Sequence, residues 1–151
     1  MKKIQFEQPI DAPVAKVYDA MLGISDKKTY EAWTTVFNPT STYEGTWKEG
    51  SQMYFVGENE KGEKGGMISE IVKNIPNQFV SIKHIGMFQG NNEILEGPDV
   101  EPWAGCLENY LLEETYGVTK VIVEMDTIEG HEDYFSETYP KALQKLKEIS
   151  E

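Results

Sequence analysis

Hydrophobic and polar residues alternate along most of the middle of the chain, whereas helical spacing is found near both ends. Alternation over residues 3–10 predicts a first strand. Similar short segments follow at about 42–47, 52–56, 67–72, 79–85, 107–113 and 118–127. Because hairpin-length turns separate most of them, we expect seven strands in one antiparallel sheet. In the last segment the residues expected to face inward are Thr119, Val121, Val123 and Met125.

Two short helices are expected after the first strand. Pro13 stands where proline begins helices well, and Gly23 ends the apolar spacing that follows it. Ser25 and Asp26 can cap a second helix. This second helix is expected to end at Asn38-Pro39 and to carry Tyr30, Trp33 and Phe37.

A longer amphipathic segment occupies residues 131–151. Its apolar stripe consists of Phe135, Tyr139, Ala142, Leu143, Leu146 and Ile149. Pro140 lies inside it, removes one helix hydrogen bond and should kink or split the helix. A sheet bracketed by helices in this order is expected to curl around the last helix and leave a hollow between them. A hollow implies a ligand.

Residues 88–105 break the alternation. They are rich in turn residues and show no period. Long loops of this kind are uncommon in compact domains and often functional. The segment is therefore either a lid over the hollow or an insertion that is disordered or packed on the surface.

Charge sets this chain apart from an ordinary globular protein. Its 26 acidic and 14 basic residues give a formal net charge of −12, and none of the basic residues is arginine. A nucleic-acid-binding surface is basic, and anionic membranes should repel this chain, so we expect neither partner. Lysine lacks the planar fork with which arginine holds carboxylates and phosphates, which argues against a clamp for such groups.

Length and hydropathy predict one domain over residues 1–151, long enough for a substantial core. No apolar run approaches the ~20 residues of a membrane-spanning helix. Met1 is followed by no signal-peptide pattern. The single cysteine, Cys106, excludes an intrachain disulfide. We therefore expect a cytoplasmic, acidic protein.

The motifs that mark catalysis are mostly missing. The chain has no nucleophile elbow, phosphate-binding loop or dinucleotide glycine pattern. The chain has only two histidines, His84 and His131, and one cysteine. These are too few for a zinc site built from histidine and cysteine alone. We expect no metal and no cofactor.

Two polar residues share strand faces with aliphatic side chains. His84 is expected to point toward the interior, where a histidine satisfied within the core is more common than a ligand contact. Glu70 shares a face with Ile68 and Val72 and would need a partner if that face were buried. The opposite register of this strand instead turns inward Met67, Ser69 and Ile71.

Several short motifs follow one another along the whole chain. They are Ile10-Asp11-Ala12-Pro13 with Val17-Tyr18, then Trp33, then Gly66, Ile68, Glu70 and Pro76, and finally Tyr139, Leu143 and Leu146. Their order resembles the START-like superfamily, also called SRPBCC. Within it the chain is most similar to the branch of homologues of the heat-shock chaperone ATPase activator (AHSA-like). Two departures are Thr138-Tyr139, where the branch commonly has Gly-Trp, and the long 88–105 segment.

The resemblance implies an α+β helix-grip fold. In this fold a curved, seven-stranded antiparallel sheet wraps on a long C-terminal helix, two short helices follow the first strand, and a cavity accommodates an apolar small molecule. Members of the superfamily include lipid carriers, aromatic cyclases, hormone receptors and co-chaperones. Fold alone therefore does not decide function.

Our first hypothesis is binding of a small hydrophobic molecule, lipid-like or aromatic, between the sheet and the C-terminal helix. The side chains expected to contact this ligand are Trp33, Phe37, Trp47, Tyr54, Glu70, His84, Trp103, Tyr110, Phe135 and Tyr139. We predict no catalytic residues, because we identify no group in the sequence that would orient His84.

Two alternatives belong to other classes of function. A cyclase- or hydratase-type enzyme would use His84, Glu70 or Tyr110 as acid or base on an apolar substrate. In that case His84 would lie in the cavity, hydrogen-bonded to a carboxylate, with room beside it for a substrate atom. A chaperone-associated adaptor in the stress response would instead bind a protein through its surface.

Overall fold

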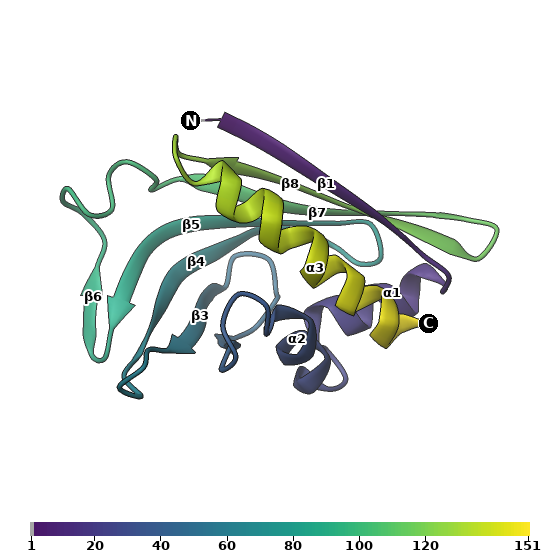
Figure 1. The fold of residues 1–151 in the computed structure, drawn as a ribbon, viewed down its shortest axis with the longest axis horizontal. Coiled ribbons are helices and arrows are strands. Elements are labelled where there is room, and N and C mark those ends of the chain that lie inside the picture. Colours follow the sequence, from purple (N-terminus) through teal and green to yellow (C-terminus); the bar gives the residue numbers. More distant parts are fainter. Residues whose placement is uncertain (1) are drawn as a thin grey trace.

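The computed structural model describes residues 2–151, which form eight strands and three helices (Figure 1). The order along the chain is β1 (Lys2–Ile10), α1 (Val14–Leu22), α2 (Lys27–Thr34), β2 (Thr42–Gly45), β3 (Gln52–Glu58), β4 (Lys64–Ile75), β5 (Phe79–Gln89), β6 (Asn92–Ile94), β7 (Cys106–Thr115), β8 (Val118–Thr127) and α3 (Glu132–Ser150). None of the helices in this part of the chain is long and apolar enough to cross a membrane.

All strands belong to one antiparallel sheet with the order β1-β8-β7-β5-β4-β3-β2, and β6 pairs with β5 beside this path. The sheet is curved, α3 crosses one of its faces, and α1 and α2 lie near the C-terminal end of α3 (Figure 1). The expected α+β helix-grip fold is thereby confirmed. The seven expected strands form the main path, and β6 is an eighth that the sequence did not reveal.

The core lies between the sheet and α3. Tyr139, Leu143 and Leu146 of α3 are buried, as the apolar stripe requires. The four residues of β8 that were expected to face inward, Thr119, Val121, Val123 and Met125, are also buried. Period-two order in a strand and period-3.6 order in a helix thus identified the two surfaces that meet.

The two short helices begin and end largely at the expected signals. Gly23 adopts a left-handed conformation, φ 67°, and its N–H donates to Asp19 at the end of α1. The side chain of Asp26 accepts a hydrogen bond from the backbone of Lys28 at the start of α2. Helix α2 ends at Thr34, earlier than expected, because residues 35–37 form a turn that places Phe37 outside the helix.

Helix α3 is one continuous element through Pro140, so the expected split is wrong. Proline removes only the hydrogen bond to the carbonyl of Ser136. Both residues are exposed, so this carbonyl lies on the side of the helix that solvent can reach. The buried stripe on the opposite side holds the two halves of the helix in line.

Strand β4 adopts the opposite register to the one that would bury Glu70. Ser69 and Ile71 are fully buried toward the core, whereas Glu70 is exposed. Ile68, on the other face, is also buried, because it packs in a second apolar cluster with Val56 and Phe88. A bulge between Ile68 and Ser69 in the pairing with β5 accompanies this arrangement.

Candidate functional site

A cavity of about 810 Å³ lies between the sheet, α2 and α3. Its lining is mostly aromatic side chains and methionines, and all of the main-path strands except β1 and β2 contribute to it. Trp33, Tyr110 and Tyr139 are buried at its inner end, whereas Asp99 and His131 are exposed at its rim. The cavity therefore runs from a buried interior to the protein surface.

Seven of the ten side chains expected to contact a ligand line this cavity: Trp33, Phe37, His84, Trp103, Tyr110, Phe135 and Tyr139. The other three lie elsewhere. Trp47 is buried in the core and its indole donates to the carbonyl of Leu22. Tyr54 packs on the far face of the sheet, and Glu70 is exposed, so the alternation places both away from the lining.

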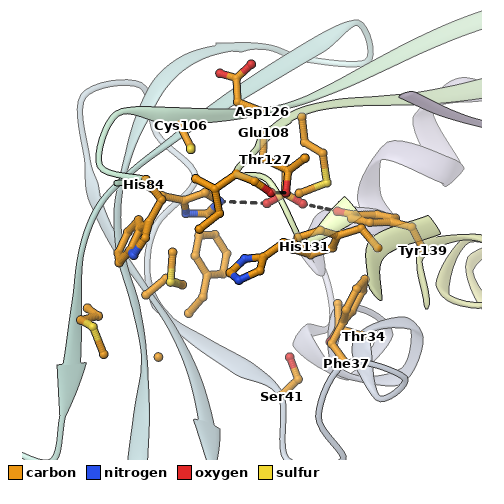
Figure 2. A pocket seen from close by; sticks show the side chains of 18 of the residues that line it. Thr34, Phe37, Ser41, His84, Cys106, Glu108, Asp126, Thr127, His131 and Tyr139 are labelled. Carbon is orange, nitrogen blue, oxygen red and sulfur yellow. Dashed lines mark hydrogen bonds and ion pairs between the residues drawn. The ribbon is translucent and has the colours of Figure 1, made fainter. Parts of the chain in front are cut away.

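Four polar side chains form a chain of hydrogen bonds at the inner end of the cavity. Ser69 Oγ lies 2.7 Å from His84 Nδ1, and His84 Nε2 lies 2.9 Å from Glu108 Oε1. The second carboxylate oxygen, Oε2 of Glu108, accepts a hydrogen bond from the hydroxyl of Tyr139. Figure 2 shows Glu108 between His84 and Tyr139, with both dashed contacts meeting at its carboxylate.

Strand pairing brings the first three of these residues together. Ser69 of β4 is paired with His84 of β5, and His84 is paired with Cys106 of β7. Glu108 follows two residues after Cys106 and so points to the same face of the sheet. The cluster is thus built on adjacent strands of the sheet, which hold it more rigidly than loops would.

The ring of Tyr139 is fixed by aromatic neighbours on several sides. Phe6 of β1 stacks on it at 5.2 Å between ring centroids, and Phe37 meets it edge-on at 5.0 Å. Phe135, one helical turn earlier on α3, lies 6.5 Å away. These contacts aim the hydroxyl at Glu108.

The neighbours of Glu108 keep this carboxylate ionised despite its position. Only 15% of its side chain is exposed, and burial by itself would raise its pKa. The hydrogen bond and charge of His84, with the hydrogen bond from Tyr139, outweigh burial and hold the pKa of Glu108 below its ordinary value. Burial first, and the charge of Glu108 second, raise the pKa of Tyr110 and of Tyr139 well above the ordinary value.

An ionised carboxylate only accepts hydrogen bonds, so His84 donates to Glu108 from Nε2–H. The hydroxyl of Ser69 can donate to a bare Nδ1 or accept from a protonated one. Among the described residues Ser69 makes no other side-chain hydrogen bond. Each of the four polar groups therefore has a partner within this chain of hydrogen bonds.

Ser69 and Glu108 are the residues that sequence reasoning missed. The sequence named no group to orient His84, but the structure provides one on each ring nitrogen. The signal for Glu108 was available, because it alternates with Tyr110, which was expected to face the cavity. Ser69 belonged to the alternative register of its strand.

The 88–105 segment contains more order than expected. It includes β6, and Val100 is fully buried. Asp99 and Trp103 line the cavity, and the indole of Trp103 donates to the carbonyl of Asp99 at 2.8 Å. The segment therefore supplies part of one cavity wall, and a lid-like movement stays a prediction.

No group of three His, Cys, Asp or Glu side chains within residues 2–151 is arranged to hold a metal ion. The polar cluster presents an ionised carboxylate, an imidazole and a phenol to an otherwise largely apolar cavity wall.

Residues 11–151 match the family model described as Activator of Hsp90 ATPase homolog 1-like protein. The chain belongs to this family. Its membership agrees with the resemblance seen in the sequence and with the helix-grip fold. The match to the Activator of Hsp90 ATPase homolog 1-like family covers nearly the whole length of the chain, and the four residues of the polar cluster lie within the matched range.

Several solved structures share the fold. Protein NE0264 from Nitrosomonas europaea is 16% identical, with a TM-score of 0.71 and coverage of 97% of this chain and 92% of its own. ChR145 from Cytophaga hutchinsonii is 19% identical, with a TM-score of 0.70 and coverage of 99% and 93%. CalU16 from Micromonospora echinospora is 18% identical, with a TM-score of 0.63 and coverage of 97% and 73%. No curated protein matches the sequence.

Proposed function

We propose that this protein binds a small, mostly apolar molecule in the cavity between the sheet, α2 and α3. The supporting observation is the cavity itself, about 810 Å³ with a largely aromatic and methionine lining and a few convergent polar groups at its inner end. Binding sites for drug-sized molecules typically have this volume and this composition. The methionines add surfaces that adapt to the shape of a ligand.

The hydrogen-bond partners and the burial of the polar groups support ligand binding over catalysis. Both ring nitrogens of His84 already have partners inside the protein, so neither is open to a ligand atom. Ser69 is 0% exposed and does not line the cavity, which argues against a nucleophilic role for its hydroxyl. The cluster is better suited to orienting the polar end of a bound molecule.

Two measurements test the proposal. Native mass spectrometry of freshly purified protein should reveal retained ligand as added mass. In solution, N-phenylnaphthylamine, a neutral apolar fluorophore, should bind saturably.

A cavity-filling variant locates the binding. Met87 is half-buried in the lining, so Met87→Trp should weaken fluorophore binding at least about tenfold by filling the cavity. Val72→Trp places the same side chain on the exposed face of the sheet and should bind as wild type does. Equal binding by all three proteins, or none by any, contradicts the proposal.

Acid–base catalysis on an apolar substrate is a second function, which one observation favours. His84 borders the cavity and is hydrogen-bonded to a carboxylate, the arrangement expected of an enzyme of this shape. The test is a screen against aromatic polyketide-like and acyl substrates, followed by His84→Ala. Turnover that is lost in this variant while fluorophore binding persists would establish the enzyme.

A further inference from the structure

We propose that the cavity selects its ligand by charge. It takes an apolar molecule whose polar end donates a hydrogen bond and is neutral or cationic, and it disfavours carboxylates and other anions. This inference rests on the proposed binding function and names the class of ligand for the same site.

The charged group at the inner end of the cavity is a carboxylate. Glu108 lies there with 15% of its side chain exposed. The lining contains no lysine, and the whole sequence contains no arginine. The carboxylate of Asp126 points away from the cavity (Figure 2), toward the backbone N–H of Leu107, which donates to it at 3.0 Å. An anion at the inner end would therefore face Glu108 with no lysine or arginine to offset the repulsion, in surroundings that screen charge poorly.

The direction of the hydrogen bonds around Glu108 also favours a ligand that donates. The two donors nearest Glu108, the Nε2–H of His84 and the hydroxyl of Tyr139, both point at this carboxylate. The carboxylate oxygens have only lone pairs left to offer, and lone pairs accept hydrogen bonds but do not donate them. A hydroxyl, an amine or an ammonium group can donate to them. A carboxylate cannot.

His84 offers an anion no free donor. Its Nδ1 is bonded to Ser69 and its Nε2 to Glu108, so neither ring nitrogen is open to a ligand atom. His131 at the exposed rim is the other lining residue able to carry a positive charge. Its exposed place at the rim marks where an anion would bind if the inference were wrong.

The test is competition among ligands of matched shape. N-phenylnaphthylamine serves as the reporter, and naphthylmethanol, naphthylmethylamine and naphthoate displace it at pH 7. The carboxylate should bind at least about tenfold more weakly than both the alcohol and the amine. Wild-type protein alone answers this question, so the test does not depend on the folding of a variant.

A pair of variants assigns the effect to one residue. Glu108→Gln removes the charge with little change of shape, and the disadvantage of naphthoate should fall to about threefold or less. Glu93→Gln is the matched control, since Glu93 is an exposed carboxylate that accepts from Tyr54 outside the cavity. It should keep the wild-type ratio.

The outcomes separate the two proposals. If the fluorophore and all three competitors fail to bind, the binding function fails. If naphthoate binds as well as the alcohol, or its binding is lost in His131→Gln, the cavity binds molecules but the charge selection is wrong. A selection that Glu108→Gln leaves unchanged also overturns it.

Discussion

Glu108 is a carboxylate on a strand face that otherwise carries apolar and aromatic side chains. Its charge is tolerated there because His84 and Tyr139 both donate to it, and without them burial would favour the protonated acid. The folded state therefore binds this proton less readily than the unfolded chain does. Such a group contributes stability above its ordinary pKa, and the contribution is lost as the pH falls.

The pH dependence of stability should reveal this linkage. At pH 7 we expect Glu108→Gln to be less stable than wild type, and the difference to shrink as the pH falls below the ordinary pKa of 4.5. Urea titrations from about pH 7 to pH 3 measure it. Glu93→Gln, which alters an exposed carboxylate, should show no comparable convergence. A gap that stays constant over this range would contradict the assignment.

The hydroxyl of Tyr139 matters separately from its ring. Tyr139→Phe keeps the stacking on Phe6 and the contact with Phe37 but removes a donor to an ionised carboxylate. We expect a loss of about 1–3 kcal/mol in the free energy of unfolding. Tyr54→Phe also removes a hydroxyl bound to a glutamate, but at a more exposed place, and should cost less than about 0.5 kcal/mol. Equal losses of unfolding free energy in the two variants would show that burial does not strengthen the hydrogen bond of Tyr139.

At the scale of elements, the pattern of the sequence predicted what periodicity controls. The inward residues of β8 and the stripe of α3 were recoverable because each repeats over several turns or residue pairs. Short features were not. The three residues of β6 are too few to show a period, and the register of β4 had two solutions until its pairing with β5 was known.

The candidate site also has a part that periodicity predicted and a part that it did not. Large side chains such as Trp33 and Tyr110 were placed correctly because alternation and helical spacing point them inward. The Ser69–His84–Glu108–Tyr139 cluster joins three strands and a helix, and no local pattern records contacts over such sequence distances. Glu108 could have been found from its neighbour Tyr110, but its partners required the fold.

Helix α3 anchors the sheet through its buried stripe. Leu143 is 1% exposed at the centre of that stripe. Leu143→Ala should lower the free energy of unfolding by about 2–5 kcal/mol, through lost burial and the cavity left behind. Lys141→Ala, on the exposed side of the same helix, should change it by less than about 0.5 kcal/mol. Denaturant unfolding of both variants measures the two changes. Similar losses in the free energy of unfolding would show that Leu143 does not lie on the buried side of the helix.

At the scale of the whole molecule, charge acts on every part of the fold. The net charge of −12 arises from 26 acidic residues and only 14 lysines, so repulsion among carboxylates opposes compaction at neutral pH. The lysine ion pairs within residues 2–151 include Lys2–Glu132 and Lys120–Glu113, both of which have an exposed lysine and are therefore of small effect.

Salt should consequently stabilise the protein. Between about 20 mM and 500 mM NaCl at pH 7, screening shortens the range of the repulsion, and we expect the melting temperature to rise by roughly 3 °C or more. The same protein provides its own control. Near pH 4.6, its isoelectric point, the net charge vanishes and the salt effect should be much smaller. Scanning calorimetry at both pH values measures the two slopes. A melting temperature that falls with salt at pH 7, or equal slopes at both pH values, would mean that specific ion pairs outweigh the net repulsion.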